Sequence, residues 1–589
     1  MSTIFIDPSD GMLSVKDSYA DKERCSSAGC YWDSENKLWK MIFTLSTLDT
    51  LLKKIPHAVY DPSMKKAIED QKKKEDALIA IKKMSDENQD IPMRLDGMDA
   101  TLFPYQKLGV LYATTNGKGV LIGDAPGLGK TLQGLTSAII MKQKGLIQDC
   151  LIVTPASLKY NWPLEIEKFT KEKYIVIDGK KPEDRISKWL DKSAFFKIAN
   201  YELIVEDLFG GRVYKEKEKE TQEEKQKRLV RERKRSFKAS VLADVKNHVW
   251  GMLITDESHY LKHTNSMRYK AIKSLKSKMK VFLTGTPMDG RLEELYSIMN
   301  ILAPGLLGSR PHFFSRYVVT DFFGGIKGYK NINEVQRVIQ PFFLRRLKKD
   351  VLKQLPEKTY ENKVIELTPE ERKIYDAIKK GKHPCVQKDG IPVEPMVRAI
   401  RCRQFCNFPQ MLEKTCKSST KLDVFKDLIE ETVKLNGEKA IVFTQYKQML
   451  NVIEQVIKDL GLKFLRIDGD TDKQLRADYQ KVFNEDASID CIIGTEAMST
   501  GLNLTGASIV VNYDDNWQPA IMAQRVDRAH RYGQKNAVMC ISFICKDTIE
   551  EKVRKILYAK DKLTSDVLGD GTDEAVLMKL GPREIEDLL

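Results

Sequence analysis

The chain has 589 residues, of which 42% are hydrophobic and 31% charged, a composition typical of a protein with several folded domains and not of a disordered or membrane protein. No run of about 18 apolar residues is present and the first residues lack the pattern of a secretory signal, so we expect an intracellular protein: cytoplasmic in a bacterial or viral setting, nuclear in a eukaryote. Lys and Arg total 97 against 83 Asp and Glu, a formal charge of +14, which favours nucleic acid as a partner.

The first 94 residues differ in pattern from the rest. Short alternating segments around CYWDSENKLWKMIF predict a small β-rich accessory module over residues 1–60. Residues 61–94 are rich in Lys, Glu, Asp and Gln, which predicts a charged helix or linker. Neither pattern indicates a function for this part of the chain.

Two sets of short apolar runs alternate with helical patterns, which predicts an α/β fold with two parallel-sheet lobes. GVLIG, CLIVTP, WGMLIT and VFLTG mark the first lobe, residues 95–300, and AIVFTQ, CIIGT, IVVNYD and CISFIC the second, residues 421–548. Residues 301–420 are expected to form helical protrusions and the inter-lobe linker, and 549–589 a C-terminal helix and tail. The charged insertion at 211–238 predicts an exposed helix, with DNA contact through its basic end as the alternative.

A glycine-bearing loop follows the first strand of lobe 1. In GVLIGDAPGLGKTLQ, Gly127 and Gly129 let backbone N–H groups turn inward on phosphates, and the helix that follows adds positive potential at its N-terminus. Lys130 would pair with the β- and γ-phosphates, and Thr131 would offer its hydroxyl to Mg²⁺. The loop therefore predicts a nucleoside triphosphate site.

Paired acids end a later strand of the same lobe. In GMLITDESH, Asp256 is placed to hold Mg²⁺ and Glu257 to polarise the attacking water. Two surface acids would be the alternative interpretation, but their position downstream of a phosphate loop favours catalysis.

Arginines recur at three-residue steps in the second lobe. QRVDRAHRYGQ places Arg525, Arg528 and Arg531 on one predicted helical face, with Gln524 and Gln534 beside them. Arg528 and Arg531 would reach the transferring phosphoryl group, a role worth about 10³ to 10⁵ in rate. A basic surface face is the alternative.

In their order these motifs resemble the Swi/Snf family of DNA-translocating ATPases within helicase superfamily two, and especially its compact annealing-helicase or bacterial and viral branch. The segments DAPGLGKT and PFFLRRLKKDVLKQLPEK (341–358) carry the resemblance. It implies two RecA-like lobes that use ATP and Mg²⁺. FPYQ resembles the family's adenine-reading motif, which adds Tyr105 and Gln106 to the nucleotide site, and QRVDRAHRYGQ adds Gln524 from lobe 2.

The resemblance also implies a grip on duplex DNA through its phosphates. The implied contacts are Ser157, Lys159 and Asn200 on lobe 1 and Gln445, Ser499, Thr500 and Trp517 on lobe 2. Phosphate contacts carry no sequence information. The expected partner is therefore double-stranded or branched DNA of any sequence, and no protein partner is indicated.

Other interpretations remain open at this point. An RNA-polymerase-recycling ATPase would share the motor, an RNA helicase would be expected to lack PFFLRRLKKDV, and a hydrolysis-dead ATP-binding DNA clamp would need only the nucleotide site. The ten cysteines predict reduced thiols. Four of them, Cys385, Cys402, Cys406 and Cys416, lack zinc-site spacing, and the resemblance makes the helix around Cys402 and Cys406 structural.

Overall fold

The computed structural model describes the chain except residues 1, 9, 17, 35, 157, 180–181, 210–244, 246, 323–324, 352–355, 389–390, 500–501, 532, 569–575 and 578–589. Ser157, Thr500 and the predicted insertion at 211–238 thus lie outside the described residues. The chain forms two units, each treated by itself. The first comprises mainly Met1–Tyr317 and Asn331–Val351, and the second mainly Val318–Lys330 and Leu352–Gly569.

The first unit begins with a small sheet and two helices. Its strands follow the order β3-β4-β2-β1-β5, where β1 is Thr3–Ile6, β2 Leu13–Lys16, β3 Tyr31–Asp33, β4 Leu38–Met41 and β5 Val59–Tyr60. Helices α1 (Lys22–Ala28) and α2 (Leu45–Lys54) supply Cys25, Leu48 and Leu51 to a core that also holds Ile4 and Val15. Leu13 and Val15, two residues apart on β2, lie on the same face of the sheet and both belong to this core.

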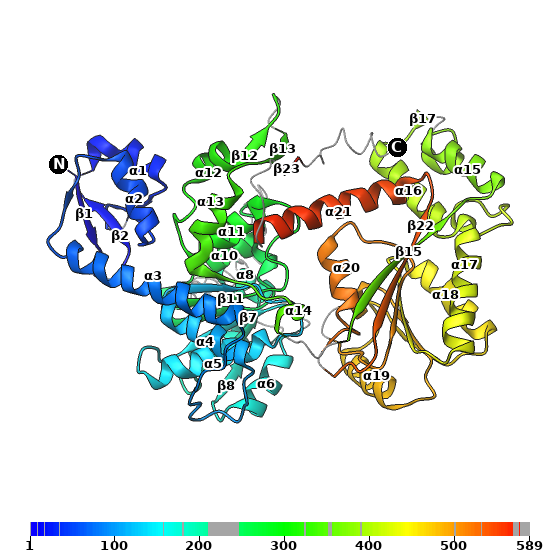
Figure 1. Ribbon diagram of the computed structural model, residues 1–589, viewed down its shortest axis with the longest axis horizontal. Helices are drawn as coiled ribbons and strands as arrows, with labels where there is room; N and C mark the ends of the chain where they lie inside the picture. Colours follow the sequence, from blue (N-terminus) through cyan, green and yellow to red (C-terminus); the bar gives the residue numbers. More distant parts are fainter. Residues whose placement is uncertain are drawn as a thin grey trace, which may run out of the picture. The chain divides into compact units, whose positions relative to one another are not determined.

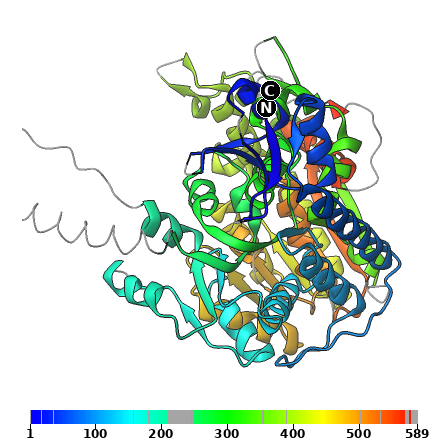
Figure 2. The same cartoon turned by 90° about the vertical axis from the view of Figure 1, so that its left-hand side faces the viewer.

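Helix α3 (Met64–Asp86) leads from this module to the first lobe and packs along α4 (Pro104–Asn116). It is charged along most of its length, and Leu78 and Ile81 are among its few buried side chains. Figure 2, seen from the side of the module, shows α3 beside α4. The predicted charged helix is therefore packed against the lobe over part of its length.

Lobe 1 is built on a seven-stranded parallel sheet with the order β14-β6-β11-β10-β7-β9-β8. The strands are β6 (Gly119–Ile122), β7 (Cys150–Thr154), β8 (Tyr174–Val176), β9 (Phe196–Asn200), β10 (Val249–Thr255), β11 (Lys276–Leu283) and β14 (Phe343–Leu344). Central strands such as CLIVT are buried along their whole length, as expected for parallel strands covered by helices on both faces. Those helices include α5 (Lys130–Gln143), α6 (Asn161–Phe169), α7 (Pro182–Leu190), α8 (Tyr201–Phe209), α10 (Met267–Ser274) and α11 (Leu292–Leu302); α12 (Arg310–Tyr317), α13 (Ile332–Ile339) and α14 (Lys348–Val351) follow.

Strands β14 and β15 lie inside the stretch expected to hold only helical protrusions and linker. Phe343–Leu344 pairs with β6 in lobe 1, and β15 (Lys358–Ile365) pairs with β22 in the second unit. Strand β14 has only two paired residues, and its partner strand lies more than 200 residues away along the chain. It is therefore too short to show the hydrophobic periodicity by which a strand is predicted. The expected boundary therefore differs from the structure at both strands.

Lobe 2, in the second unit, is a six-stranded parallel sheet with the order β15-β22-β21-β18-β20-β19. Its strands are β18 (Ala440–Phe443), β19 (Phe464–Ile467), β20 (Cys491–Gly494), β21 (Ile509–Asn512) and β22 (Val538–Cys545), besides β15. Helices α15 (Pro369–Lys379), α16 (Pro395–Asn407), α17 (Thr420–Ile429), α18 (Lys447–Asp459), α19 (Lys473–Glu485), α20 (Pro519–Val526) and α21 (Ile549–Leu568) belong to the same unit, which is drawn from green to red in Figure 1. The predicted α/β fold with two parallel-sheet lobes is confirmed.

The second unit also holds two short sheets. One is antiparallel, with the order β12-β13-β23 over Val318–Thr320, Ile326–Tyr329 and Val576–Leu577, and the other pairs β16 (Gln387–Lys388) with β17 (Ile391–Pro392). Among the helices the structure describes, none is both long and apolar enough to cross a membrane.

Candidate functional site

The carboxyl ends of four neighbouring strands bring the predicted catalytic residues of lobe 1 to one edge of its sheet. Ile122 of β6 pairs with Leu283 of β11, and Thr255 of β10 pairs with both Phe282 and Val153, so the strands end nearly level. In parallel α/β sheets ligands bind outside this edge. The phosphate loop, the paired acids and the segment LTGTP (residues 283–287) all begin there.

The glycine-bearing loop between β6 and α5 adopts a conformation that suits phosphate binding. Gly127 and Gly129 have φ of 86° and 70°, and α5 starts at Lys130, so its first N–H groups lie at the loop. The ammonium of Lys130 donates to the carbonyl oxygen of Asp124 at 2.8 Å. Thr131 follows in the first turn of α5. The structure thus brings Gly127, Gly129, Lys130 and Thr131 together.

A buried ion pair between Asp124 and Arg346 supports this loop. Asp124 is fully buried, and its carboxylate accepts hydrogen bonds from the guanidinium of Arg346, with Nε at 2.9 Å, and from Gln133 Nε2 at 3.0 Å. Arg346 also donates to the carbonyl oxygen of Tyr105. The sequence motifs gave Arg346 no role, although it lies within the family segment 341–358.

Gln106 braces the same loop. Its Nε2 donates to the carbonyl oxygen of Leu128 at 3.2 Å, and its Oε1 accepts from the backbone N–H of Phe103 at 3.0 Å. Tyr105 is only 2% exposed, and its ring stacks on Phe103 at 5.8 Å. Both predicted residues therefore lie beside the phosphate loop, and adenine reading stays a prediction.

We expect Gly129→Ala to weaken ATP binding, because the new methyl group would both strain the backbone and clash with Gln106. The new Cβ would lie 2.3 Å from Gln106 Nε2 at a φ of +70°, so the loop or its brace must shift. Gly145→Ala is the matched control, because Gly145 has a φ of +69° and a Cβ added there would meet no atom within 4 Å. Nucleotide titration of the two variants checks this, and equal affinities would contradict the role of Gln106.

Asp256 follows β10 directly and sits in a polar pocket of its own lobe. Its carboxylate accepts from Trp162 Nε1 at 3.0 Å and Thr154 Oγ1 at 3.4 Å. Burial, and then the charge of neighbouring Glu257, raise the pKa of Asp256 to about 6, although the charge of Lys130 acts in the opposite direction. The site therefore carries excess negative charge, and an oxygen-ligated Mg²⁺ fits Asp256 and Thr131.

Glu257 has a left-handed backbone conformation, with φ 49° and ψ 53°, that residues other than glycine rarely adopt. His259 Nδ1 lies 3.1 Å from its carboxylate and 3.4 Å from Thr284 Oγ1 in the LTGTP segment. The hydroxyl of Ser258 donates to the carbonyl oxygen of Leu283 at 3.1 Å. Strain of this kind concentrates at functional sites, and the paired acids are tied directly to LTGTP.

The two described lobe 1 residues predicted to bind DNA are turned inward. Lys159 is 7% exposed, and its ammonium lies 3.4 Å from the carbonyl oxygen of Ile177. Asn200 is 7% exposed and donates to Glu202 Oε2 at 2.8 Å. Either side chain would have to rotate outward to reach a phosphate, so both contacts stay predictions.

In lobe 2 the predicted row of arginines on one helical face is wrong. Helix α20 ends at Val526, so Arg528 and Arg531 lie in the turns that follow it. Arg525, the one on the helix, is fully buried and holds Asn512 Oδ1 at 3.2 Å and the carboxylate of Glu496. A three-residue step predicts a shared face only while the helix continues.

The two arginines after α20 hold backbone carbonyl groups of their own lobe. Arg528 Nη1 donates to Leu502 O at 2.9 Å, and Arg531 Nε donates to Asp527 O at 3.0 Å. Gln524 is half-buried, and its carbonyl oxygen accepts from Arg528 Nε at 3.1 Å. Their predicted roles at the nucleotide stay predictions.

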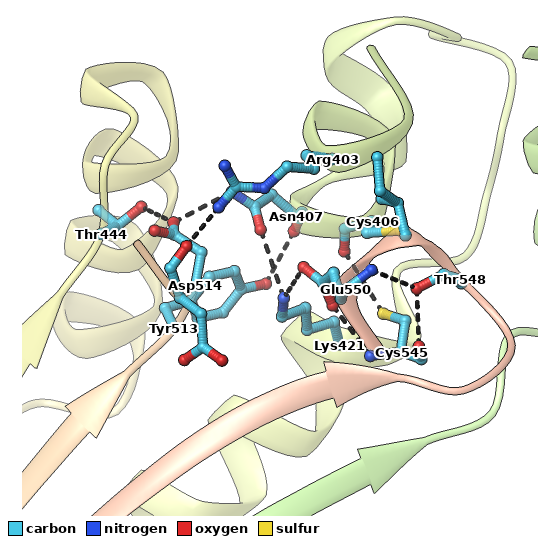
Figure 3. A network of polar contacts seen from close by, with 12 residues as sticks. Arg403, Cys406, Asn407, Lys421, Thr444, Tyr513, Asp514, Cys545, Thr548 and Glu550 are labelled. Carbon is cyan, nitrogen blue, oxygen red and sulfur yellow. Dashed lines mark hydrogen bonds and ion pairs between the residues drawn. The ribbon is translucent and has the colours of Figure 1, made fainter. Parts of the chain in front are cut away.

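A buried carboxylate organises the carboxyl edge of lobe 2. Asp514, after β21, accepts from Thr444 Oγ1 at 2.5 Å, the backbone N–H of Gln445 at 3.0 Å and Asn407 Nδ2 at 3.0 Å (Figure 3). Gln445 Nε2 donates to Asp515 O at 2.6 Å. The predicted DNA contact Gln445 is therefore joined to α16 through Asp514.

Trp517 and Ser499 are held by their neighbours in the same lobe. The guanidinium of Arg403 lies 4.9 Å from the Trp517 ring centroid, and Lys560 of α21 donates to Trp517 O at 3.1 Å. Ser499 is 3% exposed and donates to Glu496 O at 2.8 Å. Helices α16 and α21 thus position the loop that carries Trp517.

One group of possible metal ligands includes a member of the cysteine cluster, whose spacing did not predict a zinc site. Among the described residues, Cys406, Cys545 and Glu550 bring ligand atoms within 4.8 Å of one another. Lys421, however, forms a buried ion pair with Glu550 at 2.6 Å (Figure 3). Hydrogen bonding with Cys406 and burial raise the pKa of the Cys545 thiol well above its usual value, whereas metal binding needs the thiolate. The ammonium of Lys421 supplies the positive charge here.

Both lobes match known families. The family model described as SNF2-related domain matches residues 65–421, and that described as helicase conserved C-terminal domain matches residues 420–533. The first match covers more than half of the chain, so this chain belongs to the SNF2 family. The resemblance found in the motifs is thereby confirmed.

Individual relatives are moderately similar. The putative ATP-dependent helicase/translocase YwqA of Bacillus subtilis is 29% identical over 83% of this chain and 50% of its own length. A chromodomain-helicase-DNA-binding protein 3 homolog of Caenorhabditis elegans is 28% identical over 83% of this chain and 28% of its own length. This chain thus spans half of these relatives or less. The Sulfolobus solfataricus SWI2/SNF2 ATPase core in complex with dsDNA is 28% identical, with a TM-score of 0.38 over 81% of this chain and 95% of that one.

Proposed function

We propose that this protein is an ATP-driven motor that moves along double-stranded DNA and remodels DNA or protein–DNA complexes. The observation that carries the proposal is the meeting of Lys130, Asp256 and Glu257 at one edge of the lobe 1 sheet. Membership of the SNF2 family and the helicase and translocase names of its relatives support it.

Each residue of lobe 1 would have a distinct task in hydrolysis. The loop N–H groups and Lys130 would hold the phosphates, and Thr131 and Asp256 would hold Mg²⁺. When bound, Mg²⁺ supplies positive charge that offsets the charge of the phosphates. Glu257 would orient and polarise the attacking water, with His259, 3.1 Å away, fixing its carboxylate.

The grip on DNA would use phosphate contacts and no base reading. The described candidates are Lys159 and Asn200 on lobe 1 and Gln445, Ser499 and Trp517 on lobe 2. Because such contacts release counterions, binding should weaken steeply as salt increases. The relative named as a DNA-binding protein supports DNA as the polymer, and branched DNA belongs to the same proposal.

We expect duplex DNA to stimulate ATP hydrolysis by the full chain much more than RNA does. The test compares steady-state turnover with no polymer, duplex DNA, fork-shaped DNA, single-stranded DNA and RNA at fixed salt. Stimulation by duplex, or more strongly by forks, is the expected result. Stimulation by RNA alone would replace the proposal with an RNA motor, and no turnover under any condition would replace it with an ATP-binding clamp.

A further inference from the structure

Three lysine side chains gather where the accessory module, α3 and the lobe 1 sheet meet. Lys74 lies on α3, Lys118 directly precedes β6, and Lys280 lies on β11. The backbone N–H of Lys280 donates to the carbonyl oxygen of Lys118 at 2.9 Å, so these two residues are neighbours. They mark the amino end of the strands, opposite to the edge that carries Lys130 and Asp256.

A small cavity opens at this junction, and Lys74 and Lys118 both line it. Gly11 and Phe43 of the module form part of its wall, and Pro341 and Phe342 contribute another part. Its volume is about 40 Å³, enough for about three water molecules. The cavity thus has the size of one small oxyanion, with cationic side chains at its wall.

Within the part of the chain that the structure describes, no carboxylate lies within ion-pair distance of the three ammonium groups. The Asp10 carboxylate is engaged with Lys40 at 2.9 Å, and only its carbonyl oxygen accepts from Lys118, at 2.6 Å. The Glu75 carboxylate accepts from the backbone N–H of Leu45 at 2.9 Å. Neither acid pairs directly with these lysines, although the charge of Glu75 acts to raise the pKa of Lys74 and that of Asp10 acts to raise the pKa of Lys118.

It is unfavourable to hold three lysine ammonium groups close together in a partly buried place without a directly paired carboxylate. The pKa values of the three lysines show this cost. Burial, and then the charge of Lys118, lower the pKa values of Lys74 and Lys280 to about 8. Burial also lowers the pKa of Lys118. A bound anion would remove the repulsion and restore the charged forms.

We propose that Lys74 and Lys118, with the charge of Lys280 beside Lys118, form a binding site for a phosphate-class oxyanion that joins the accessory module to lobe 1. Gly11 of the module lies close to Lys118: a Cβ at Gly11, where φ is +65°, would lie 2.6 Å from the Lys118 ammonium, which would have to move. The phosphate group would be either a free oxyanion or a phosphodiester of DNA. This site does not rest on the proposed motor activity, since no nucleotide hydrolysis enters the argument.

Thermal unfolding of the full chain tests the site. Five of the six tryptophans lie in the first unit, so their fluorescence reports mainly on the module and lobe 1. At fixed pH and ionic strength, inorganic phosphate should raise the Tm above its value in chloride, with saturation as phosphate increases. Because the loop at Lys130 also binds phosphate in the proposed function, Lys74→Met should lose only part of the rise, whereas Lys73→Met, whose lysine is exposed on the same helix, should keep all of it.

Lys280→Met is a second variant, for which we expect opposite effects on the Tm in chloride and on the response to phosphate. Because it removes one of three repelling cations, it should unfold at the same or a higher Tm than wild type in chloride and still show a smaller rise in phosphate than wild type does. Equal responses to phosphate and chloride in wild type, or an undiminished response in both Lys74→Met and Lys280→Met, would overturn the proposal.

The source of the phosphate is separated by titrating a short labelled duplex without ATP. If DNA supplies the group, Lys74→Met should weaken duplex binding and reduce the slope of log affinity against log salt by about one, and Lys73→Met should leave both unchanged. If the ligand is a free oxyanion, wild type, Lys74→Met and Lys73→Met should bind the duplex with the same affinity, while the rise of Tm in phosphate is smaller in Lys74→Met.

Discussion

Replacing Glu257 with Gln is expected to reduce DNA-stimulated ATP turnover by about 10²- to 10⁴-fold, the range by which a positioned general base accelerates a reaction. An amide has nearly the same shape as the carboxylate but cannot accept the proton of the attacking water. ATP and duplex binding should therefore remain close to wild type. Single-turnover hydrolysis, nucleotide titration and duplex titration measure the three quantities separately.

Glu69→Gln is the control for this change, because Glu69 is exposed on α3, away from the paired acids. Surviving turnover in Glu257→Gln would remove Glu257 from its proposed role and direct attention to His259, 3.1 Å from it. Loss of ATP binding together with turnover would instead indicate damage to the strained backbone at φ 49°.

Arg346→Met should destabilise the first unit by about 3–5 kcal/mol, the usual result of removing one partner from a buried ion pair. The change would leave Asp124 buried, without its guanidinium partner and directly under the phosphate loop. ATP affinity should fall as well, because Asp124, which would lose its partner, also offers its carbonyl oxygen to the ammonium of Lys130 at 2.8 Å. Urea unfolding followed by tryptophan fluorescence reports the stability of this unit.

An exposed pair serves as the comparison. Arg316 Nε lies 2.8 Å from Glu334 with a side chain 48% exposed, so Arg316→Met should change stability by about 1 kcal/mol or less. The double variant Asp124→Asn with Arg346→Met should recover part of the loss, since it no longer buries a lone charge. Equal effects of Arg346→Met and Arg316→Met would show that the buried pair contributes nothing special.

Several elements of the fold and site could be predicted because their signals are local. The strand of GMLITDESH and the loop around Lys130 each combine an apolar run, a turn residue and a helix start within about ten residues. Strands buried on both faces are uniformly apolar, so both parallel sheets were expected from short runs. The match to two family models confirms the class that these motifs indicated.

The errors arose where a pattern was extended beyond its physical basis. A three-residue step placed Arg525, Arg528 and Arg531 on one face, but α20 ends at Val526, and the turns that follow aim the side chains differently. Burial is not visible in a motif either: the phosphate contact of Lys159 stays a prediction, but its side chain is turned inward in the structure.

By itself the sequence determined the family, the order of the two lobes and the positions of the glycine-bearing loop and the paired acids, because these depend on residues that are close along the chain. Only the tertiary structure decided that Arg346 supports Asp124, 222 residues earlier, and that Lys74, Lys118 and Lys280 share one place. Such contacts form when strands and helices from distant segments pack together. No period or motif encodes which of the many possible long-range pairs the packed core will bring into contact.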